Sequence, residues 1–475
     1  MHLGVNNSAD SATIKAGSHR RRNLAGFLKA MTDKAGSDGH REAGRMSLIA
    51  FAIRVISAGI AFLTQILLAR LMGQFEYGIF VFIWVIAIIC GNLSCLGFHT
   101  AVIRFVPQYT ASGEVDEIRG LTFTAKLVAF GVASAVALVG LAFVHLFADR
   151  IAAYYLVPLV LCAVLLPVIA VGDAMDGTAR ANSWVVQALS PTYVIRPVLI
   201  PVFMVTAIWI GYDATAETAL FAAIVATYLT TIGQLTILGR RLRKRFKRGP
   251  RKYHLAYWSK IALPIFLIEG FYFLLTNSDV VMVGLFLEPD NVATYFAAAK
   301  TMALVHFVYF AVKAGMMPRF AQLVAEKKHQ ELARFAALAA RWTFLPSLAL
   351  GVIVLALGPF LLSLFGPNFA AGHSVMFILF IGIAAKAFIG PGEALLTMAG
   401  QQKICALIYL AVLTVNVAGN IALIPHFGIN GAAAATMTAM FAETLLLFAI
   451  IRARLGIAMH VLSRRHLEST EHGGR

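Results

Sequence analysis

Long apolar runs, separated by short polar segments, occupy this sequence from residue 46 to residue 452. A run of about 20 apolar residues is the length at which a helix crosses about 30 Å of hydrocarbon. Backbone that faces lipid must satisfy its own hydrogen bonds, so such runs form helices, whereas a membrane β-barrel shows short alternating segments. The chain is 59% hydrophobic and 13% charged, against about one half and one quarter in soluble domains. We therefore expect an all-α, polytopic membrane protein.

The apolar runs predict about twelve transmembrane helices. The predicted spans are 47–70, 77–98, 120–147, 154–174, 185–210, 217–239, 257–286, 293–317, 341–365, 373–397, 404–424 and 429–451. Lys and Arg crowd the loops at 240–252 and 318–340, whereas the loops at 212–215, 288–291, 367–369 and 425–427 contain neither. Because basic loops stay in the cytoplasm, we expect a protein of the bacterial inner (plasma) membrane with both termini cytoplasmic. The other loops are too short for an extracellular catalytic domain.

Basic residues recur at one fixed offset. Arg104-Phe105 returns as Arg319-Phe320, and Arg119 returns as Arg334, in each case 215 residues later. An even number of spans in each half gives two six-helix lobes in the same orientation, related by an axis along the membrane normal. The predicted parts are a disordered basic cytoplasmic tail (1–45), an N-terminal lobe (46–239), a basic linker (240–256), a C-terminal lobe (257–452) and a cytoplasmic tail (453–475). Met46 is an alternative start of translation.

Several short segments also follow a familiar order. They read Ala-Arg-Leu-Met-Gly at 69–73, Glu-Tyr-Gly at 76–78, Asp-Val-Val-Met-Val-Gly at 279–284 and, most specifically, Pro-His-Phe-Gly-Ile-Asn-Gly-Ala-Ala at 425–433. Over about 46–455 the chain resembles bacterial polysaccharide transporters, the lipid-linked oligosaccharide flippases of the multidrug/oligosaccharidyl-lipid/polysaccharide exporter superfamily. The resemblance implies two six-helix lobes, a central cavity and alternating access. It also implies undecaprenyl-pyrophosphate-linked sugars as substrates, for lipopolysaccharide O-antigen, capsule or exopolysaccharide.

Polar and basic residues within the spans are the candidates for a substrate cavity. A charge in a span costs about 2.5–3.5 kcal/mol, so it usually faces a cavity or a partner, and a guanidinium matches a pyrophosphate. Together these residues predict a basic cavity that attracts an anionic head group. Each also has a structural alternative, such as snorkelling for Arg54 or hydrogen bonding between helices for the asparagines. The candidates are Arg54, Gln65, Arg196, Lys300, His306, Lys313, Lys386, Asn416 and Asn420.

Acidic residues within the spans suggest ion coupling or gating. Glu269 lies 215 residues beyond Arg54, so the repeat predicts a membrane ion pair between them, either coupled to transport or purely structural. Asp279 and Glu443 are further candidates for ion coupling, although Asp279 could simply cap a helix. Asp173 and Glu393 are repeat-related gate candidates, with solvated helix ends as the alternative.

These features favour a transporter over an enzyme. The sequence has no phosphate loop of the Walker type, and its four cysteines lack metal-ligand spacing, so we expect neither cofactor nor metal. Alternatives to a flippase are a cation-coupled multidrug exporter, which needs an acidic cavity, and an integral-membrane polysaccharide polymerase or ligase, which needs a large periplasmic segment. The expected partners are lipid-linked oligosaccharide, membrane lipids and other polysaccharide-assembly proteins. We expect a monomer that does not bind nucleic acid, because its basic residues are spread over several loops.

Overall fold

The computed structural model describes residues 38–247 and 249–463, and the side chains of residue 53 and of residues 55–247 and 249–463. The chain divides into two compact units, 1–52 and 53–475, and all that follows concerns the second. In the described residues every regular element is helical, which confirms the all-α prediction. The predicted tail at 1–45 lies largely outside the described residues, although α2 already begins at Asp38.

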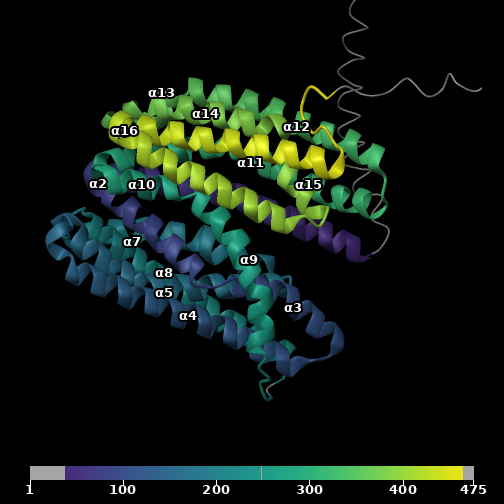
Figure 1. Ribbon diagram of the computed structural model, residues 1–475. Coiled ribbons are helices and arrows are strands. Elements are labelled where there is room, and N and C mark those ends of the chain that lie inside the picture. The colour runs from purple at the N-terminus through teal and green to yellow at the C-terminus, as the bar shows by residue number, and fades with distance from the viewer. Residues whose placement is uncertain (1–37, 248, 464–475) are drawn as a thin grey trace, which may run out of the picture. The chain divides into compact units, whose positions relative to one another are not determined.

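The helices of unit 53–475 fall into two groups along the chain (Figure 1). The N-terminal group comprises α2 (Asp38–Leu93), α3 (Phe98–Ser112), α4 (Val115–Leu146), α5 (Ala153–Ala181), α6 (Val185–Ser190), α7 (Arg196–Ile210) and α8 (Ala216–Arg245). The C-terminal group comprises α9 (Leu255–Leu275), α10 (Ser278–Phe286), α11 (Pro289–Ala325), α12 (His329–Ala356), α13 (Gly358–Ser363), α14 (Gly372–Ile389), α15 (Gly392–Met398) and α16 (Gln402–Leu455). Short turns at η1 (Ala148–Arg150), η2 (Pro191–Ile195) and η3 (Pro367–Ala371) complete the described helical elements.

Helix α2 reverses its direction at Gly73. This glycine has φ 79° and ψ 174°, a backbone conformation that residues with a Cβ rarely adopt. Four residues later the Tyr77 hydroxyl donates a hydrogen bond of 2.9 Å to Gln65 Oε1. In a continuous helix these two residues would lie about 18 Å apart along the axis. The element α2 therefore contains two antiparallel helices.

Helix α16 reverses in the same way at Gly428, which has φ 57° and ψ −136°. Asn416 Nδ2 lies 3.3 Å from Thr436 Oγ1 across the turn, whereas a continuous helix would separate the two residues by about 30 Å. Ten described helices are long and apolar enough to cross a membrane. Because two of them fold back on themselves, the described chain makes twelve crossings, as the apolar runs predict.

The helix ends differ from the predicted spans. Helix α11 runs from Pro289 to Ala325 and α5 ends only at Ala181, beyond the predicted limits 293–317 and 154–174. Hydropathy detects the part of a helix within hydrocarbon, but backbone hydrogen bonding continues into its polar ends. The predicted span 257–286 is interrupted between α9 and α10, where the Asn277 side chain donates a hydrogen bond of 2.9 Å to the carbonyl of Phe273.

Small residues line the contacts between neighbouring helices. On α4, Ala125, Ala129 and Ala133 are fully buried, whereas Phe130 and Leu138 on the other face are 51% and 68% exposed. Alanines at intervals of four residues let helix backbones approach closely, and large apolar side chains suit lipid.

The described part of the predicted C-terminal tail is also packed: Arg341 donates to the carbonyls of Val461 and Ser463.

The two groups contact each other directly at the end that holds Gly73. Arg70 donates to the carbonyls of Leu364 and Ser363 at 2.7 and 2.5 Å. Gln74 donates to Thr294 Oγ1 at 2.8 Å. A Cβ added to Gly78 would lie 1.9 Å from the carbonyl oxygen of Pro289. This set of contacts is called the closed end below.

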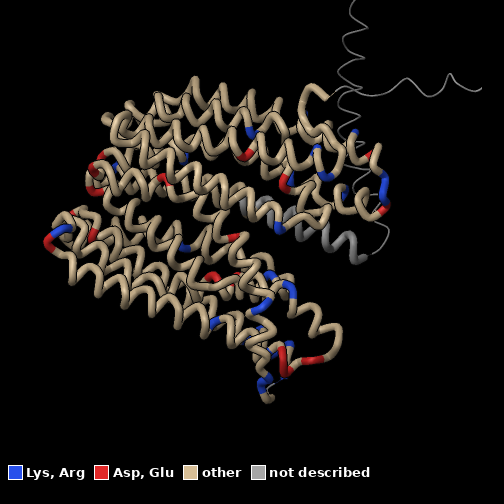
Figure 2. The backbone as a smooth tube through the Cα atoms, viewed as in Figure 1, with Lys and Arg blue, Asp and Glu red and all other residues tan. Residues whose placement is uncertain are grey.

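At the opposite end α9 connects the two groups. Its first turns pack on the N-terminal group, where Trp258 Nε1 donates to the Tyr109 hydroxyl at 3.0 Å. Its later part packs on α16, where the Tyr272 and Tyr409 rings lie 5.2 Å apart. Figure 2 shows Lys and Arg gathered at this end, around the start of α9 and the loop between α11 and α12.

Candidate functional site

A cavity of about 1250 Å³ lies between the two helix groups. Helices α3 and α5, with Asn92 of α2 and Tyr193 of η2, line it on one side, and α9, α10, α11, α14, α15 and α16 line it on the other. Its wall is unusually rich in ionisable side chains for a membrane interior. These are His99, Arg104, Asp173, Asp176, Arg180, Glu269, Asp279, Lys300, His306, Lys313, Lys386, Glu393 and Glu443.

Two ion pairs fix the lysines deep in the C-terminal group. Lys313 Nζ lies 2.8 Å from Glu393 Oε1, and the Tyr309 hydroxyl donates to the same carboxylate. Lys386 Nζ lies 2.9 Å from Glu443 Oε1. Each pair joins two helices of one group, α11 with α15 and α14 with α16. These lysines are therefore neutralised locally and leave little positive charge for a ligand.

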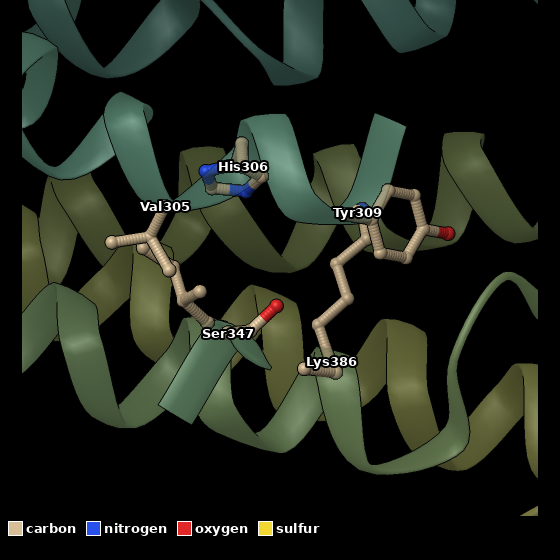
Figure 3. A pocket seen from close by; sticks show the side chains of 7 residues that line it. Val305, His306, Tyr309, Ser347 and Lys386 are labelled. Atoms are coloured by element: carbon tan, nitrogen blue, oxygen red, sulfur yellow. The ribbon is translucent and has the colours of Figure 1, made fainter. Parts of the chain in front are cut away.

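A second, much smaller cavity adjoins the Lys386 side chain (Figure 3). Its volume of about 10 Å³ is near the minimum for one water molecule. Figure 3 shows the His306 ring, the Ser347 hydroxyl and the Lys386 stem around it. It is too small for a substrate, so the large cavity is the candidate functional site.

Three cations of the large cavity remain available to a ligand. Within the described chain, Arg104 and Lys300 have no carboxylate oxygen within 4.0 Å, and both side chains are exposed to the cavity. Lys300 Nζ lies 4.9 Å from the centre of the Phe296 ring. Arg180 forms only a long ion pair, 3.8 Å from Asp176 Oδ2, and its side chain is 39% exposed. These three residues, which lack a close ion pair, come from α3, α5 and α11 and are called the free cations below.

Glu269 connects the two groups across the cavity. The Thr100 hydroxyl on α3 lies 3.0 and 2.9 Å from the two oxygens of this carboxylate on α9. His99 Nε2 lies 3.4 Å from Oε2. The predicted partner Arg54 has its side chain outside the described residues, so that ion pair stays a prediction.

Comparisons with known proteins agree with this architecture. The sequence pattern of the polysaccharide biosynthesis protein family matches residues 44–324, more than half of the chain. The chain belongs to this family. The MatE pattern matches residues 264–422 within the C-terminal group. A search of curated proteins returns no match.

Solved structures of transporters share the fold. An inward-facing multidrug resistance MATE family transporter of the MOP superfamily has a TM-score of 0.69 at 14% identity, covering 84% of this chain and 94% of that one. An outward-facing MATE family transporter gives 0.58 at 16% identity, covering 87% and 95%. A MOP superfamily transporter from Pyrococcus furiosus gives 0.60 at 14% identity, covering 89% and 97%. This member of the polysaccharide biosynthesis family is therefore a multi-pass membrane protein that shares the fold of these MATE transporters.

Most of the candidate residues of this protein lie on the cavity wall. They are the basic candidates Lys300, His306, Lys313 and Lys386, the amide Asn416, and the acidic candidates Asp173, Glu269, Asp279, Glu393 and Glu443. Asp279 accepts a hydrogen bond of 2.8 Å from the Tyr295 hydroxyl, and Asp173 accepts one of 3.3 Å from Asn92. Glu393, for which a solvated helix end was the alternative, is only 5% exposed.

Three other candidates lie behind the wall. Asn420 is fully buried and donates a hydrogen bond to the carbonyl of Asn416 at 2.8 Å. Gln65 binds Tyr77 within the α2 turn. The Arg196 guanidinium lies 5.3 Å from the centre of the Trp84 ring, outside the set of residues that line the cavity. These three residues support the packing of the helices that form the wall.

The cavity is not the predominantly basic one that the sequence predicts. Its wall carries six carboxylates against five Lys and Arg. The prediction counted the basic residues in the spans but overlooked Asp176, and it could not show that Lys313 and Lys386 are paired. It also missed His99 and Arg180, because the predicted spans 77–98 and 154–174 end just before these residues, whereas α3 contains His99 and α5 continues to Ala181. In the sequence, Arg104 stands out only as a loop residue that recurs as Arg319. This repeat is the signal that could have marked Arg104 as a residue of the cavity.

Proposed function

We propose that this protein is a transporter, a flippase that moves polyprenyl-pyrophosphate-linked oligosaccharide across the bacterial inner membrane, for lipopolysaccharide, capsule or exopolysaccharide synthesis. The observation that supports this function best is the set of free cations, Arg104, Arg180 and Lys300, on the wall of a large cavity. A pyrophosphate presents several anionic oxygens, and guanidinium forks bind such groups at two points. Family membership supports the same class of pathway.

The rest of the cavity suits the sugars. Drug-sized ligands occupy pockets of about 300–1000 Å³, and the volume here, about 1250 Å³, accommodates a larger head group. Gln402 and Thr436 offer amide and hydroxyl groups, and Tyr272 and Tyr409 offer aromatic faces. The polyprenyl chain, which is as apolar as the bilayer, remains in the membrane.

The contacts between the groups suggest the direction of loading. The positive-inside rule assigns the basic loops, which lie opposite the closed end, to the cytoplasm. The closed end is then periplasmic, and this conformation would accept substrate from the cytoplasmic leaflet. Alternating access follows when the closed-end contacts of Arg70 and Gln74 break and the groups approach each other at the opposite end.

The test is transport by the purified protein in proteoliposomes that contain a fluorescent polyprenyl-pyrophosphate sugar. Replacing Arg104 and Lys300 together by alanine should reduce the flipping rate at least about tenfold, because two charge-assisted contacts are lost. Arg319→Ala is the matched control: Arg319 is the repeat counterpart of Arg104 but binds Gln322 and Glu331 away from the cavity. Normal flipping in the double variant, with intact protein, contradicts the proposed role of the free cations.

A second candidate is a cation-coupled multidrug exporter. The MatE match over residues 264–422 and the six carboxylates of the wall favour it. Against it, Glu393 and Glu443 are already neutralised by lysines. Proteoliposomes loaded with a cationic dye separate the two functions: a drug exporter transports the dye and does not flip the sugar lipid, and a flippase does the reverse.

A further inference from the structure

A cluster of basic residues ends helix α8 outside the cavity. It consists of Arg240, Arg243 and Lys244 on the helix and Lys247 just after it, and is called the basic patch below. All four residues are exposed, and none has a carboxylate oxygen within 4.0 Å in the part of the chain that the structure describes. Four adjacent cations without a carboxylate partner attract an anion strongly, so we expect the patch to bind an anionic partner from outside the chain.

The position of the patch identifies the kind of partner. Val225, Leu229 and Ile232 form a stripe on α8 and are 38%, 54% and 56% exposed. With 3.6 residues per turn, Arg240 and Arg243 lie on the same helix face as this stripe. The opposite face is packed inside the N-terminal group. The stripe faces lipid, so the patch lies where the lipid-facing surface leaves the hydrocarbon.

Several other basic residues at the same end of the molecule are already engaged. Arg119 donates to Asp116 and to the carbonyl of Lys247. Lys252 Nζ lies 3.4 Å from Glu117, and Lys328 Nζ lies 3.0 Å from Glu326. The contact between Arg119 and the backbone of Lys247 also anchors the end of the patch to α4. The patch is therefore both a local excess of charge and part of a fixed surface.

We infer that the basic patch binds the headgroups of anionic phospholipids in the adjacent leaflet. Clusters of Lys and Arg directly outside a transmembrane helix attract anionic lipid, and long basic side chains reach the headgroups from a lipid-facing position. An acidic protein segment is a poorer match, because the patch continues a stripe that faces lipid. The phosphodiester of a phospholipid such as phosphatidylglycerol meets the guanidinium and ammonium groups there.

The test compares spin-labelled phosphatidylglycerol with spin-labelled phosphatidylcholine around the full-length protein in bilayers. Wild type should prefer the anionic lipid, and high salt should weaken that preference. Replacing all four residues by glutamine should reduce the preference about fivefold or more. The control changes Arg319, Lys327, Lys328 and Arg334 to glutamine, in and beside the loop between α11 and α12 at the same end, where the carboxylates Glu326 and Glu331 also lie. This control should keep the preference.

Two further measurements make the result decisive. Arg240→Lys with Arg243→Lys keeps the charge and should keep the lipid preference, which separates electrostatic binding from damage to the fold. An unchanged preference in the fourfold glutamine variant overturns the inference. The inference is also overturned if the wild type binds a polyglutamate peptide, the fourfold glutamine variant does not, and the lipid preference of the variant is unchanged. The patch then binds acidic protein segments.

Discussion

The Lys386–Glu443 pair is almost removed from solvent, with side chains 13% and 3% exposed. Breaking a buried pair costs more than the pair itself contributes, because one charge is left without its partner. Glu443→Gln keeps the size of the side chain but leaves the lysine unneutralised. We expect it to lower the free energy of unfolding by about 3–5 kcal/mol, measured by thermal denaturation in detergent.

The double variant Lys386→Met with Glu443→Gln is the control for this prediction. It removes both charges, so it should recover a large part of the lost stability. Glu331→Gln, at an exposed pair whose oxygen lies 3.5 Å from Arg319, should change stability by less than about 1 kcal/mol. If Glu443→Gln is as stable as wild type, the pair is not the structural contact described above.

A charged residue within an apolar run is a useful indicator of a cavity residue. Whether its side chain points into the cavity does not follow from the residue type. Lys300 and His306 could be selected because a charge in a span needs a polar surrounding. Arg196 meets the same criterion, yet it follows the π-helical turn η2 and lies against Trp84. Which cations are paired depends on contacts such as Lys313 with Glu393, 80 residues apart, and no local pattern encodes such a contact.

Among the elements, the linker before α9 is attached to α4 by specific contacts. Arg119 donates to the carbonyls of Lys247 and Pro250, and the Lys252 amide donates to the carbonyl of Asp116 at 3.1 Å. A Cβ on Gly120 would lie 1.8 Å from the carbonyl oxygen of Lys252. The linker is therefore fastened to α4.

Arg119→Ala should release this linker. The loss of charge-assisted hydrogen bonds, each contributing about 1.5–3 kcal/mol, should increase the rate of chymotrypsin cleavage at Phe246 and Tyr253 about tenfold. The matched control is Arg334→Ala, because Arg334 occupies the repeat-related position on α12 and is exposed. Equal cleavage rates in the two variants would show that Arg119 does not hold the linker.

Helix number and type could be predicted at the level of elements, but helix ends could not. The apolar runs predict twelve crossings because hydrocarbon thickness fixes their length, and the turns at Gly73 and Gly428 confirm them. The interruption between α9 and α10 depends on Asn277, whose side chain binds a backbone carbonyl. A side chain that competes in this way for the hydrogen bonds of a helix cannot be detected from the hydropathy of the sequence.

At the scale of the whole molecule, Gly78 sets how closely the two groups meet. The carbonyl oxygen of Pro289 occupies the space that a Cβ on Gly78 would fill, at 1.9 Å. Gly78→Ala should therefore separate the groups at the closed end and favour a conformation open there. The change can be followed by thiol labelling of Val292→Cys, a position with no exposure in this conformation, after the four native cysteines are replaced by alanine.

Labelling of the thiol introduced by Val292→Cys should be faster by about tenfold or more in the Gly78→Ala protein. Gly140→Ala provides the comparison, because nothing lies within 4 Å of a Cβ at that position, and it should label as slowly as the parent. Unchanged labelling after Gly78→Ala would mean that the closed end tolerates the methyl group by local adjustment and does not control the conformation.

The near balance of charge on the cavity wall determines how a membrane potential would act on the proposed cycle. A potential of 100 mV does about 2.3 kcal/mol of work on each unit charge that crosses it. With six carboxylates set against five Lys and Arg, the empty protein returns with little charge to carry through this field. The loaded protein carries the negative pyrophosphate, which a potential negative inside drives outward. The charge of the substrate, rather than the charge of the protein, would then make the cycle run in one direction.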